Sequence, residues 1–276
     1  RIVQPRLAER MGRPVVVENR PGAASQVGTQ YVAKAAPDGN TVLVCFDTHA
    51  INPIAKKNLP YDTFKDFAGV SLAVRFPLVI GAHPAVPGKN LKEFLEAAKR
   101  EPGKFSYAST GVGSMNHLVA EDLKRQAGVD ILHVPFGGGG PAVAAVLGNT
   151  VSFTLLSYAA LKGSIAGGKA KALAVTGTKR LADLPDVPTV AESGFPGFEA
   201  YSWIGIFAPS ATPAATVRKL SEDFQAALRH EEVSKKLTDA GFEVMATDGP
   251  ALERFAVGQF ERWSDFVKRT GLKMEE

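Results

Sequence analysis

Residues 105–117 read Phe105-Ser-Tyr-Ala-Ser-Thr-Gly-Val-Gly-Ser-Met-Asn-His117. This segment predicts a strand that ends at Ala108, a turn of small and hydroxylated residues, and a helix that begins near Ser114. Apolar residues then recur at helical spacing, and a glycine stands where the helix should end: Met115, Leu118, Val119, Leu123 and Gly128. The segment therefore predicts a strand–turn–helix unit, and the same alternation extends along most of the chain.

The turn of this unit is a candidate anion site. Backbone N–H groups at a helix N-terminus lack intrahelical partners, and the helix dipole adds partial positive charge there. Both features suit a carboxylate or a phosphate. Hydroxyl groups could add donors and glycines let a ligand approach the backbone, which makes the candidates Ser109, Thr110, Gly111, Gly113 and Ser114. The alternative is that Ser114 only caps the helix and the glycines only form the turn.

The composition is typical of a globular protein and excludes several function classes. Of 276 residues, 45% are hydrophobic and 22% are charged, and no run approaches the ~18 apolar residues of a membrane span. The net charge of +4 is spread thinly, which argues against a nucleic-acid partner but suits a small anion. Cys45, the single cysteine, lies in an apolar run and is expected in a buried strand.

Strands and helices are expected to alternate, which predicts an α/β fold with parallel strands and ligands at their carboxyl ends. Strands are expected at 15–17, 41–46, 72–82, 105–108, 131–135, 151–155, 170–176 and 201–208. Helices are expected at 2–11, 26–36, 90–99, 142–147, 214–228, 231–240 and 250–270, with others starting near Ser114 and Ser157. Residues 47–53 are expected to be a turn that leaves the end of a strand.

Two long apolar strands flank a central α/β block and predict two lobes joined by a two-strand hinge. The first lobe is expected to comprise residues 1–78 and 203–276, and the second lobe residues 79–202. A cleft between two lobes is the usual ligand site, and closure around the ligand is the usual motion.

Motifs of common enzymes are absent from the sequence. No Gly-x-Ser-x-Gly elbow is present, and His230-Glu-Glu-Val-Ser234 lacks the second histidine of a zinc helix. The glycines at 137–140 are not followed by the Lys-Ser/Thr of a P-loop. His49 and His117 are expected in or beside turns that face the cleft, with helix packing as the alternative for His117, whereas His133 is expected to be a hydrogen-bonded structural residue. No nucleophile–base pair emerges, so we expect no catalytic residues and no enzyme activity.

Several motifs together resemble the substrate-binding proteins of tripartite tricarboxylate transporters, the Bug family. They occur in order along nearly the whole chain: Arg13-Pro-Val-Val-Val-Glu-Asn-Arg-Pro-Gly22, Ala36-Pro-Asp-Gly39, His49-Ala-Ile-Asn-Pro53, Leu59-Pro-Tyr-Asp62, Tyr107-Ala-Ser-Thr-Gly-Val-Gly-Ser114, His133-Val-Pro-Phe136, Leu184-Pro-Asp-Val-Pro-Thr189 and Gly197-Phe-Glu199. The resemblance implies a periplasmic, two-lobed periplasmic-binding-protein fold (Venus flytrap, type II-like). It also implies that a ligand carboxylate meets the turn that contains Ser109, Thr110, Gly111 and Ser114.

The sequence departs from the family pattern at three places. The family's first strand and its Pro- and Gly-rich loop would precede Arg1 and are expected upstream of the given sequence. Asp47 stands where a small neutral residue is more usual, so it would repel a second carboxylate or pair with an amino or hydroxyl group of the ligand. Ser152 replaces an aspartate, and the glycines at 137–140 replace a Lys-Gly pattern.

The sequence thus predicts an extracytoplasmic receptor that delivers a small organic carboxylate to the membrane subunits of a tripartite transporter. The ligand is expected to be a di- or tricarboxylate or an aromatic acid, and the protein a periplasmic monomer without a cofactor, metal or nucleic-acid partner. Asp47, Thr48 and His49 of the first lobe and Ser157 and Tyr158 of the second lobe are expected to complete the site. Phe46 and Phe136 are expected in the core, with the cleft as the alternative. The competing hypotheses are a ligand-sensing effector module of a regulator and a hydrolase.

Overall fold

The computed structural model describes residues 1–274 and divides into two compact units. Unit 1 comprises Arg1–Arg75 and Trp203–Glu276, and unit 2 comprises Phe76–Ser202. The chain passes from unit 1 to unit 2 within the long strand β2 (Phe67–Ala82) and returns at the start of β7 (Tyr201–Pro209). The sequence-based division places the first boundary after residue 78 and the second after residue 202.

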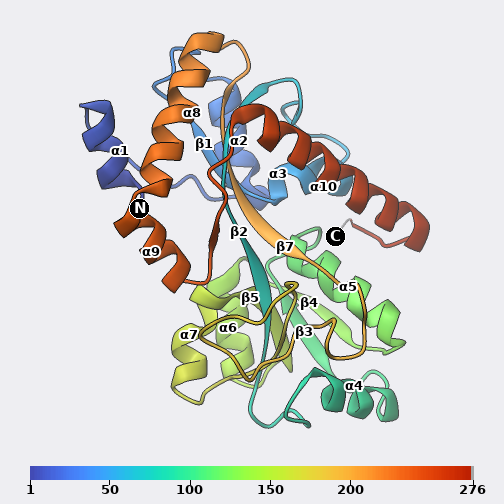
Figure 1. Ribbon diagram of the computed structural model, residues 1–276. Helices are drawn as coiled ribbons and strands as arrows, with labels where there is room; N and C mark the ends of the chain where they lie inside the picture. Colours follow the sequence, from blue (N-terminus) through green and yellow to red (C-terminus); the bar gives the residue numbers. More distant parts are fainter. Residues whose placement is uncertain (275–276) are drawn as a thin grey trace. The chain divides into compact units, whose positions relative to one another are not determined.

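Unit 1 is built on a sheet in which β7 lies between β1 and β2. Strand β1 (Leu43–Phe46) pairs antiparallel with β7, and the short β8 (Glu243–Val244) pairs antiparallel with β2. The helices that surround this sheet are α1 (Gln4–Met11), η1 (Ala23–Ser25), α2 (Gln26–Ala33), α3 (Thr48–Ala55), α8 (Ala214–Arg229), α9 (Glu231–Asp239) and α10 (Gly249–Thr270). Figure 1 shows α8 and α10 in the orange and red part of the chain, beside strands that come from its first third. Unit 1 is therefore assembled from both ends of the sequence.

Two sequence predictions in unit 1 are wrong. Residues 15–17 form no strand, and Val16 is 86% exposed, because the described residues offer this segment no strand to pair with. Residues 47–53, expected as a turn, contain most of helix α3, which accommodates Pro53 in its last turns. A proline at the sixth position of an eight-residue helix removes one backbone donor and normally indicates a helix end. Helix α3 forms nonetheless, and it packs against α10.

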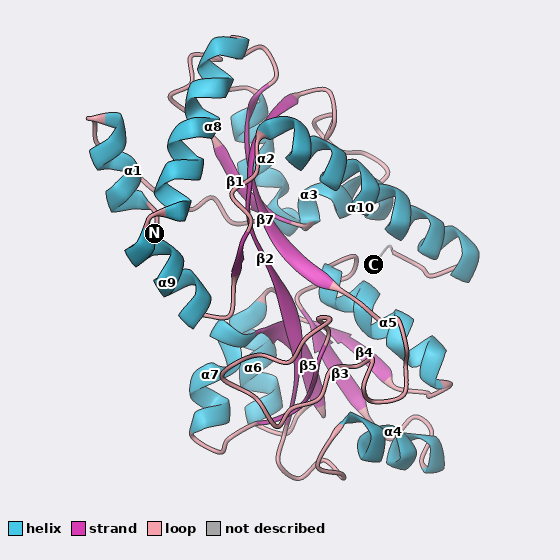
Figure 2. Ribbon diagram, in the orientation of Figure 1, coloured by secondary structure: helices cyan, strands magenta, loops and turns pink. Residues whose placement is uncertain are grey.

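Unit 2 carries a mixed sheet covered on both faces. Strands β3 (Ser106–Ser109), β4 (Leu132–Pro135) and β5 (Phe153–Ser157) are parallel, whereas the second half of β2 is antiparallel to both β5 and β6 (Lys171–Val175). The order within this sheet is β6-β2-β5-β3-β4. In Figure 2, α6 (Gly139–Leu147) and α7 (Tyr158–Ala166) lie on one side of these strands, and α5 (Met115–Ala127) lies on the other, with α4 (Leu91–Arg100) near the ends of the strands. The expectation of parallel strands is thus confirmed for the three strands that lead into α5, α6 and α7.

Each unit has its own aromatic core. In unit 1, Trp203 on β7 and Trp263 on α10 are almost fully buried, and in unit 2, Phe94 packs edge-on against Phe105 and Phe153 at 5.3 Å between ring centroids. Cys45 is 4% exposed in β1, which confirms its expected burial. Aromatic pairs with this geometry stabilise a core by about 1 kcal/mol beyond the burial of their area.

Close packing of β2 against α10 depends on two glycines. A Cβ built on Gly69 would lie 2.6 Å from the carbonyl oxygen of Gly249, and a Cβ on Gly249 would lie 2.1 Å from the carbonyl oxygen of Gly69. Both distances are far below van der Waals contact, so any side chain here would push the helix away from the sheet.

A buried carboxylate joins the first helix of unit 1 to α8. Asp223 is 2% exposed, and its Oδ1 accepts hydrogen bonds from Arg10 Nε at 2.8 Å and Lys219 Nζ at 2.5 Å. Because a buried carboxylate is stable only when it is paired and hydrogen-bonded, this cluster fixes α1 on α8.

We predict that Asp223→Ala lowers the free energy of unfolding by about 1–3 kcal/mol, because it leaves two cations without their shared acceptor. The matched control is Asp265→Ala, which removes an exposed carboxylate 3.7 Å from Arg269 and should change stability by less than about 0.5 kcal/mol. Urea unfolding monitored by tryptophan fluorescence measures both. Equal effects of the two substitutions would contradict this role of Asp223.

Candidate functional site

The carboxyl ends of the three parallel strands of unit 2 lie at one edge of the sheet, and a helix begins after each of them. Helices α5, α6 and α7 follow β3, β4 and β5, and none of the three has a side-chain hydrogen bond to its first turn from its N-cap residue. Side-chain caps occur at α4, where Asn90 accepts from the Glu93 N–H, and at α10, where Asp248 accepts from the Ala251 N–H. Three helix N-termini without side-chain caps therefore lie at the sheet edge where α/β proteins bind ligands, although helices of unit 1 also start without such caps.

The turn from β3 into α5 has the shape predicted from its sequence. The strand ends at Ser109, the helix begins at Met115, and Gly111 and Gly113 have φ angles of 127° and 76°. A residue with a side chain rarely adopts these φ values, so the two glycines let the backbone reverse within a few residues. Ser114 has extended backbone angles and stands at the N-cap position.

The hydroxyl groups of the turn bond within the turn itself. Ser114 Oγ donates to Gly111 O at 2.6 Å or to Asn116 Oδ1, and Thr110 Oγ1 donates to Asn116 Oδ1 at 3.1 Å. Ser114 therefore does not cap the helix, and the alternative that it serves only as a cap is wrong. In this structure the protons of these hydroxyls already have acceptors, and the expectation that they donate to a ligand stays a prediction. Asn116, which the sequence analysis missed, collects these bonds. Its position two residues after the N-cap serine is the sequence feature that could have indicated this role.

The backbone N–H groups around the turn are free instead. Within residues 1–274, no group accepts a hydrogen bond from the N–H of Val112, Met115, Asn116 or His117. Met115, Asn116 and His117 are 3–5% exposed, so these donors belong to buried residues that would normally be paired. The arrangement presents several N–H groups and the positive end of a 13-residue helix dipole to an anion.

Two histidines stack directly below the turn. The rings of His117 on α5 and His133 on β4 lie 4.1 Å apart between centroids at an angle of 11°, and His133 also stacks on Tyr107 at 4.9 Å. Burial lowers the pKa of both imidazoles, that of His133 to about 4, where the neighbouring His117 contributes as well. His133 Nε2 lies 2.6 Å from Ser109 Oγ, which confirms the expected structural hydrogen bond.

The contact between Ser109 and His133 is a serine–histidine pair that the sequence analysis did not find. A nucleophilic serine needs an exposed oxygen and a free path for a carbonyl carbon. Ser109 is 0% exposed, and its Oγ also accepts from the Gly111 N–H at 3.2 Å and lies 3.1 Å from Gly111 O. With its hydrogen-bonding capacity filled and no solvent contact, this hydroxyl holds the turn and has no access to a substrate.

The candidates in unit 1 lie at the carboxyl end of β1. Asp47 precedes α3 and is 4% exposed, and its carbonyl oxygen accepts from the Ala50 N–H. Thr48 Oγ1 lies 3.4 Å from Ser25 Oγ. Their expected contact with a ligand remains a prediction.

His49 lies two residues after the turn at the end of β1, in helix α3, and its side chain packs inside unit 1; its expected contact with a ligand stays a prediction. Its side chain is 2% exposed, and its ring centroid lies 4.3 Å from that of Phe207 and 5.1 Å from that of Phe67. Helix α3, which the sequence analysis missed, turns this residue inward. Burial lowers the pKa of His49 to about 4.

The remaining candidates differ in their surroundings. Ser157 is half-buried at the N-cap of α7, whereas Tyr158 is 7% exposed and packs in the core of unit 2. Burial and the Asp183 carboxylate raise the pKa of Tyr158. Phe136 packs against the same core, as expected, but Phe46 is 50% exposed and is not a core residue.

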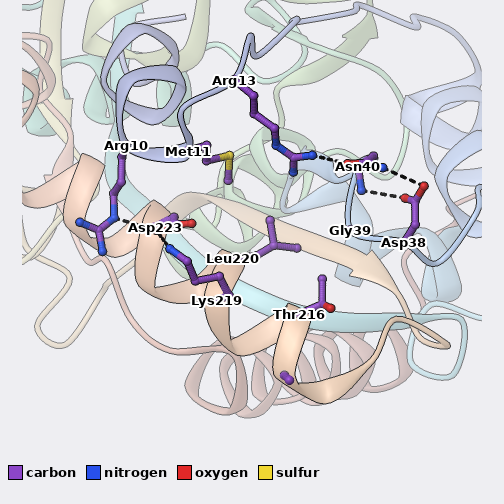
Figure 3. Close-up of a pocket in the computed structure, with 11 residues that line it drawn as sticks. Arg10, Met11, Arg13, Asp38, Gly39, Asn40, Thr216, Lys219, Leu220 and Asp223 are labelled. Carbon is purple, nitrogen blue, oxygen red and sulfur yellow. Dashed lines mark hydrogen bonds and ion pairs between the residues drawn. The ribbon is translucent and has the colours of Figure 1, made fainter.

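A surface hollow of about 480 Å³ lies in unit 1, away from every candidate residue (Figure 3). Met11, Thr216 and Leu220 lie between two polar clusters, one of Arg10, Lys219 and Asp223 and the other of Arg13, Asn40 and Asp38. Arg10 and Lys219 pair with Asp223, whereas Arg13 donates to Asn40 Oδ1 and the Asn40 N–H donates to Asp38.

No group of three or more metal-ligating side chains occurs within residues 1–274. Over the same residues, no helix combines the length and apolar character needed to cross a membrane.

Comparison with known proteins gives consistent similarities. The sequence matches the model of the tripartite tricarboxylate transporter family receptor over residues 1–272. A solved R. palustris protein with adipate is 29% identical, with a TM-score of 0.94, and the match covers 100% of this chain and 92% of that one. The periplasmic binding protein BugD is 33% identical, with a TM-score of 0.90 and coverage of 100% and 92%. MatC from Rhodopseudomonas palustris, solved with bound malate, is 32% identical, with a TM-score of 0.87 and coverage of 96% and 92%.

The burial of His49 predicts an acid-dependent loss of stability. Because the pKa of His49 is about 4 in the folded protein and ~6.5 in an unfolded chain, the unfolded state binds the extra proton between these values. Stability is unaffected by this group above pH 6.5 and falls as the pH drops towards 4. When the pH falls from 7.5 to 4.5, the free energy of unfolding should decrease in both proteins. The decrease should be about 2.5 kcal/mol smaller in His49→Phe than in the wild type, as measured by urea titration. Equal losses in the two proteins would contradict the buried neutral imidazole.

Proposed function

This chain belongs to the tripartite tricarboxylate transporter receptor family, and we propose that it binds a small aliphatic dicarboxylate through the turn between β3 and α5. The family and the fold expected from the sequence motifs are confirmed. The observation that carries the proposed site is the set of unpaired backbone N–H groups of Val112, Met115, Asn116 and His117. We further propose that the receptor works in the periplasm and delivers its ligand to the membrane subunits of the transporter.

The number of free donors matches one carboxylate. A carboxylate has two oxygens with about four acceptor positions, and four N–H groups around one turn can fill them. Hydrogen bonds to an ionised group contribute about 1.5–3 kcal/mol each when they are buried. The positive end of the α5 dipole adds to this attraction, so the turn can bind an anion without a cationic side chain.

The choice of a dicarboxylate rests on two observations. Adipate and malate, the ligands of two proteins about 30% identical to this chain, are both small aliphatic diacids. Helices α6 and α7 also begin without side-chain caps at the same sheet edge of unit 2, and a second acidic group would be favoured there. Ser157, at the N-cap of α7, is the candidate for that contact.

A proline substitution can test the backbone donors directly. Met115 is the first residue of α5, where proline is tolerated, and Ser114 before it has φ and ψ of −78° and 160°, which a following proline requires. Met115→Pro therefore removes one N–H while it leaves the helix intact, and Met115→Ala removes the same side chain but keeps the N–H.

We predict that Met115→Pro weakens the binding of adipate and malate about 10- to 100-fold relative to Met115→Ala, the cost of one charge-assisted hydrogen bond. Isothermal titration calorimetry measures both affinities, and circular dichroism checks that the two variants keep the same helix content. Equal affinities of the two variants would contradict the proposed site. Failure of the wild type to bind either diacid at millimolar concentration would contradict the ligand class.

A further inference from the structure

The side chain of His117 holds the backbone of the turn in place. The Gly113 N–H donates to His117 Nδ1 at 3.1 Å, and both residues are buried. Because Nδ1 accepts this bond, it carries no proton, and the ring is the neutral tautomer with its hydrogen on Nε2. Gly113 has a φ of 76° and lies between Val112 and Ser114, so this bond fixes the peptide plane that precedes the helix start.

The surroundings favour the neutral ring. Burial is the largest cause that lowers the pKa of His117, Lys124 on the same helix acts in the same direction, and the Glu121 carboxylate opposes them. Glu121 is itself engaged, since its Oε1 accepts from Tyr107 Oη at 2.8 Å and Lys124 Nζ at 2.6 Å. The stacked His133, at 4.1 Å, has a pKa of about 4 and offers no negative charge that would favour a proton on His117.

A proton on His117 cannot be accommodated without a change in the turn. It would add to Nδ1 and point at the Gly113 N–H, so that two donors would face each other at 3.1 Å. The Gly113 peptide must then rotate or the ring must leave its place, and either change alters the backbone of the turn that carries the neighbouring N–H groups.

We propose that His117 is a positioning residue of the carboxylate-binding turn, which it keeps in its binding form only while its imidazole is neutral. This inference rests on the proposed function and adds to it a release mechanism, in which acidification weakens ligand binding through the loss of the hydrogen bond between Gly113 and His117.

The first test needs no ligand. NMR of the ¹⁵N-labelled full chain follows the Gly113 amide and the His117 ring from pH 8 to pH 5. We expect the Gly113 amide resonance to shift with the same midpoint as the His117 ring, and that shift to be absent in His117→Asn. Asn Oδ1 can take the place of Nδ1 as an acceptor, but the side chain does not titrate. A Gly113 resonance that stays constant while His117 titrates would overturn the proposal.

The second test measures adipate affinity from pH 8 to pH 5, with each protein normalised to its own value at pH 8. Below the midpoint of His117, wild-type affinity should fall relative to His117→Asn by about tenfold for each pH unit, the slope of one linked proton. The ratio between the two proteins cancels the protonation of adipate itself. His117→Ala, which has no acceptor for the Gly113 N–H, should bind more weakly than His117→Asn at every pH.

The outcomes separate the two proposals. Parallel pH profiles of the wild type and His117→Asn, or a wild-type affinity that rises on acidification because the imidazolium attracts the anion, would overturn the role of His117. Absence of adipate binding at pH 8 would count against the proposed ligand class, and the ligand-free NMR test would still decide whether His117 controls the turn.

Discussion

The proposed function depends on a small set of backbone N–H groups that have no hydrogen-bond partner within residues 1–274. The first turn of any helix has such groups, and most helices satisfy them with an N-cap side chain. Helix α5 does not, because the hydroxyl of Ser114 bonds back to Gly111 or across to Asn116. The side chains of the turn therefore hold the backbone in its conformation, and the backbone N–H groups remain available to bind an anion. Such a site is specific for an anion of the right size, since it offers donors without a mobile charged side chain.

Hydrogen bonds and ring contacts from the rest of unit 2 hold this turn in place. The parallel pairing of β3 with β4 and β5 brings Ser109 beside Pro135 and lets the Phe136 N–H bond to the Ser109 carbonyl at 3.0 Å. Under the turn, the rings of His117, His133 and Tyr107 form a stack that continues to Phe153 in the core. A site whose second layer is an aromatic stack is rigid, and rigid donors need little reorganisation when an anion binds.

Local sequence rules were enough to predict the position and shape of the turn. The Ser-Thr-Gly-Val-Gly-Ser pattern lies between a strand and a helical repeat, and it determines the shape of the turn locally. The two glycines and the hydroxylated residues all lie within six positions of one another. The direction of the hydrogen bonds was not predictable in the same way. Whether a hydroxyl points to a ligand or into the protein depends on acceptors such as Asn116 Oδ1 and on His133, which is 24 residues from Ser109.

The errors in unit 1 have the same origin. Residues 48–53 lie in a short helix although they contain Pro53, because α3 packs on α10, more than 190 residues later in the chain. Residues 15–17 have the composition of a strand, but a strand also needs a neighbour, which sequence alone does not provide. In both cases a long-range contact, or its absence among the described residues, outweighs the local preference.

A crystal structure of the full chain in complex with malate or adipate would test the backbone site directly. We expect one carboxylate of the ligand with its oxygens about 2.7–3.1 Å from the backbone nitrogens of Val112, Met115, Asn116 and His117, and the hydroxyls of Thr110 and Ser114 still bonded to Asn116. A ligand bound elsewhere, or one held mainly by side-chain cations while these N–H groups stay unpaired, would contradict the proposed site.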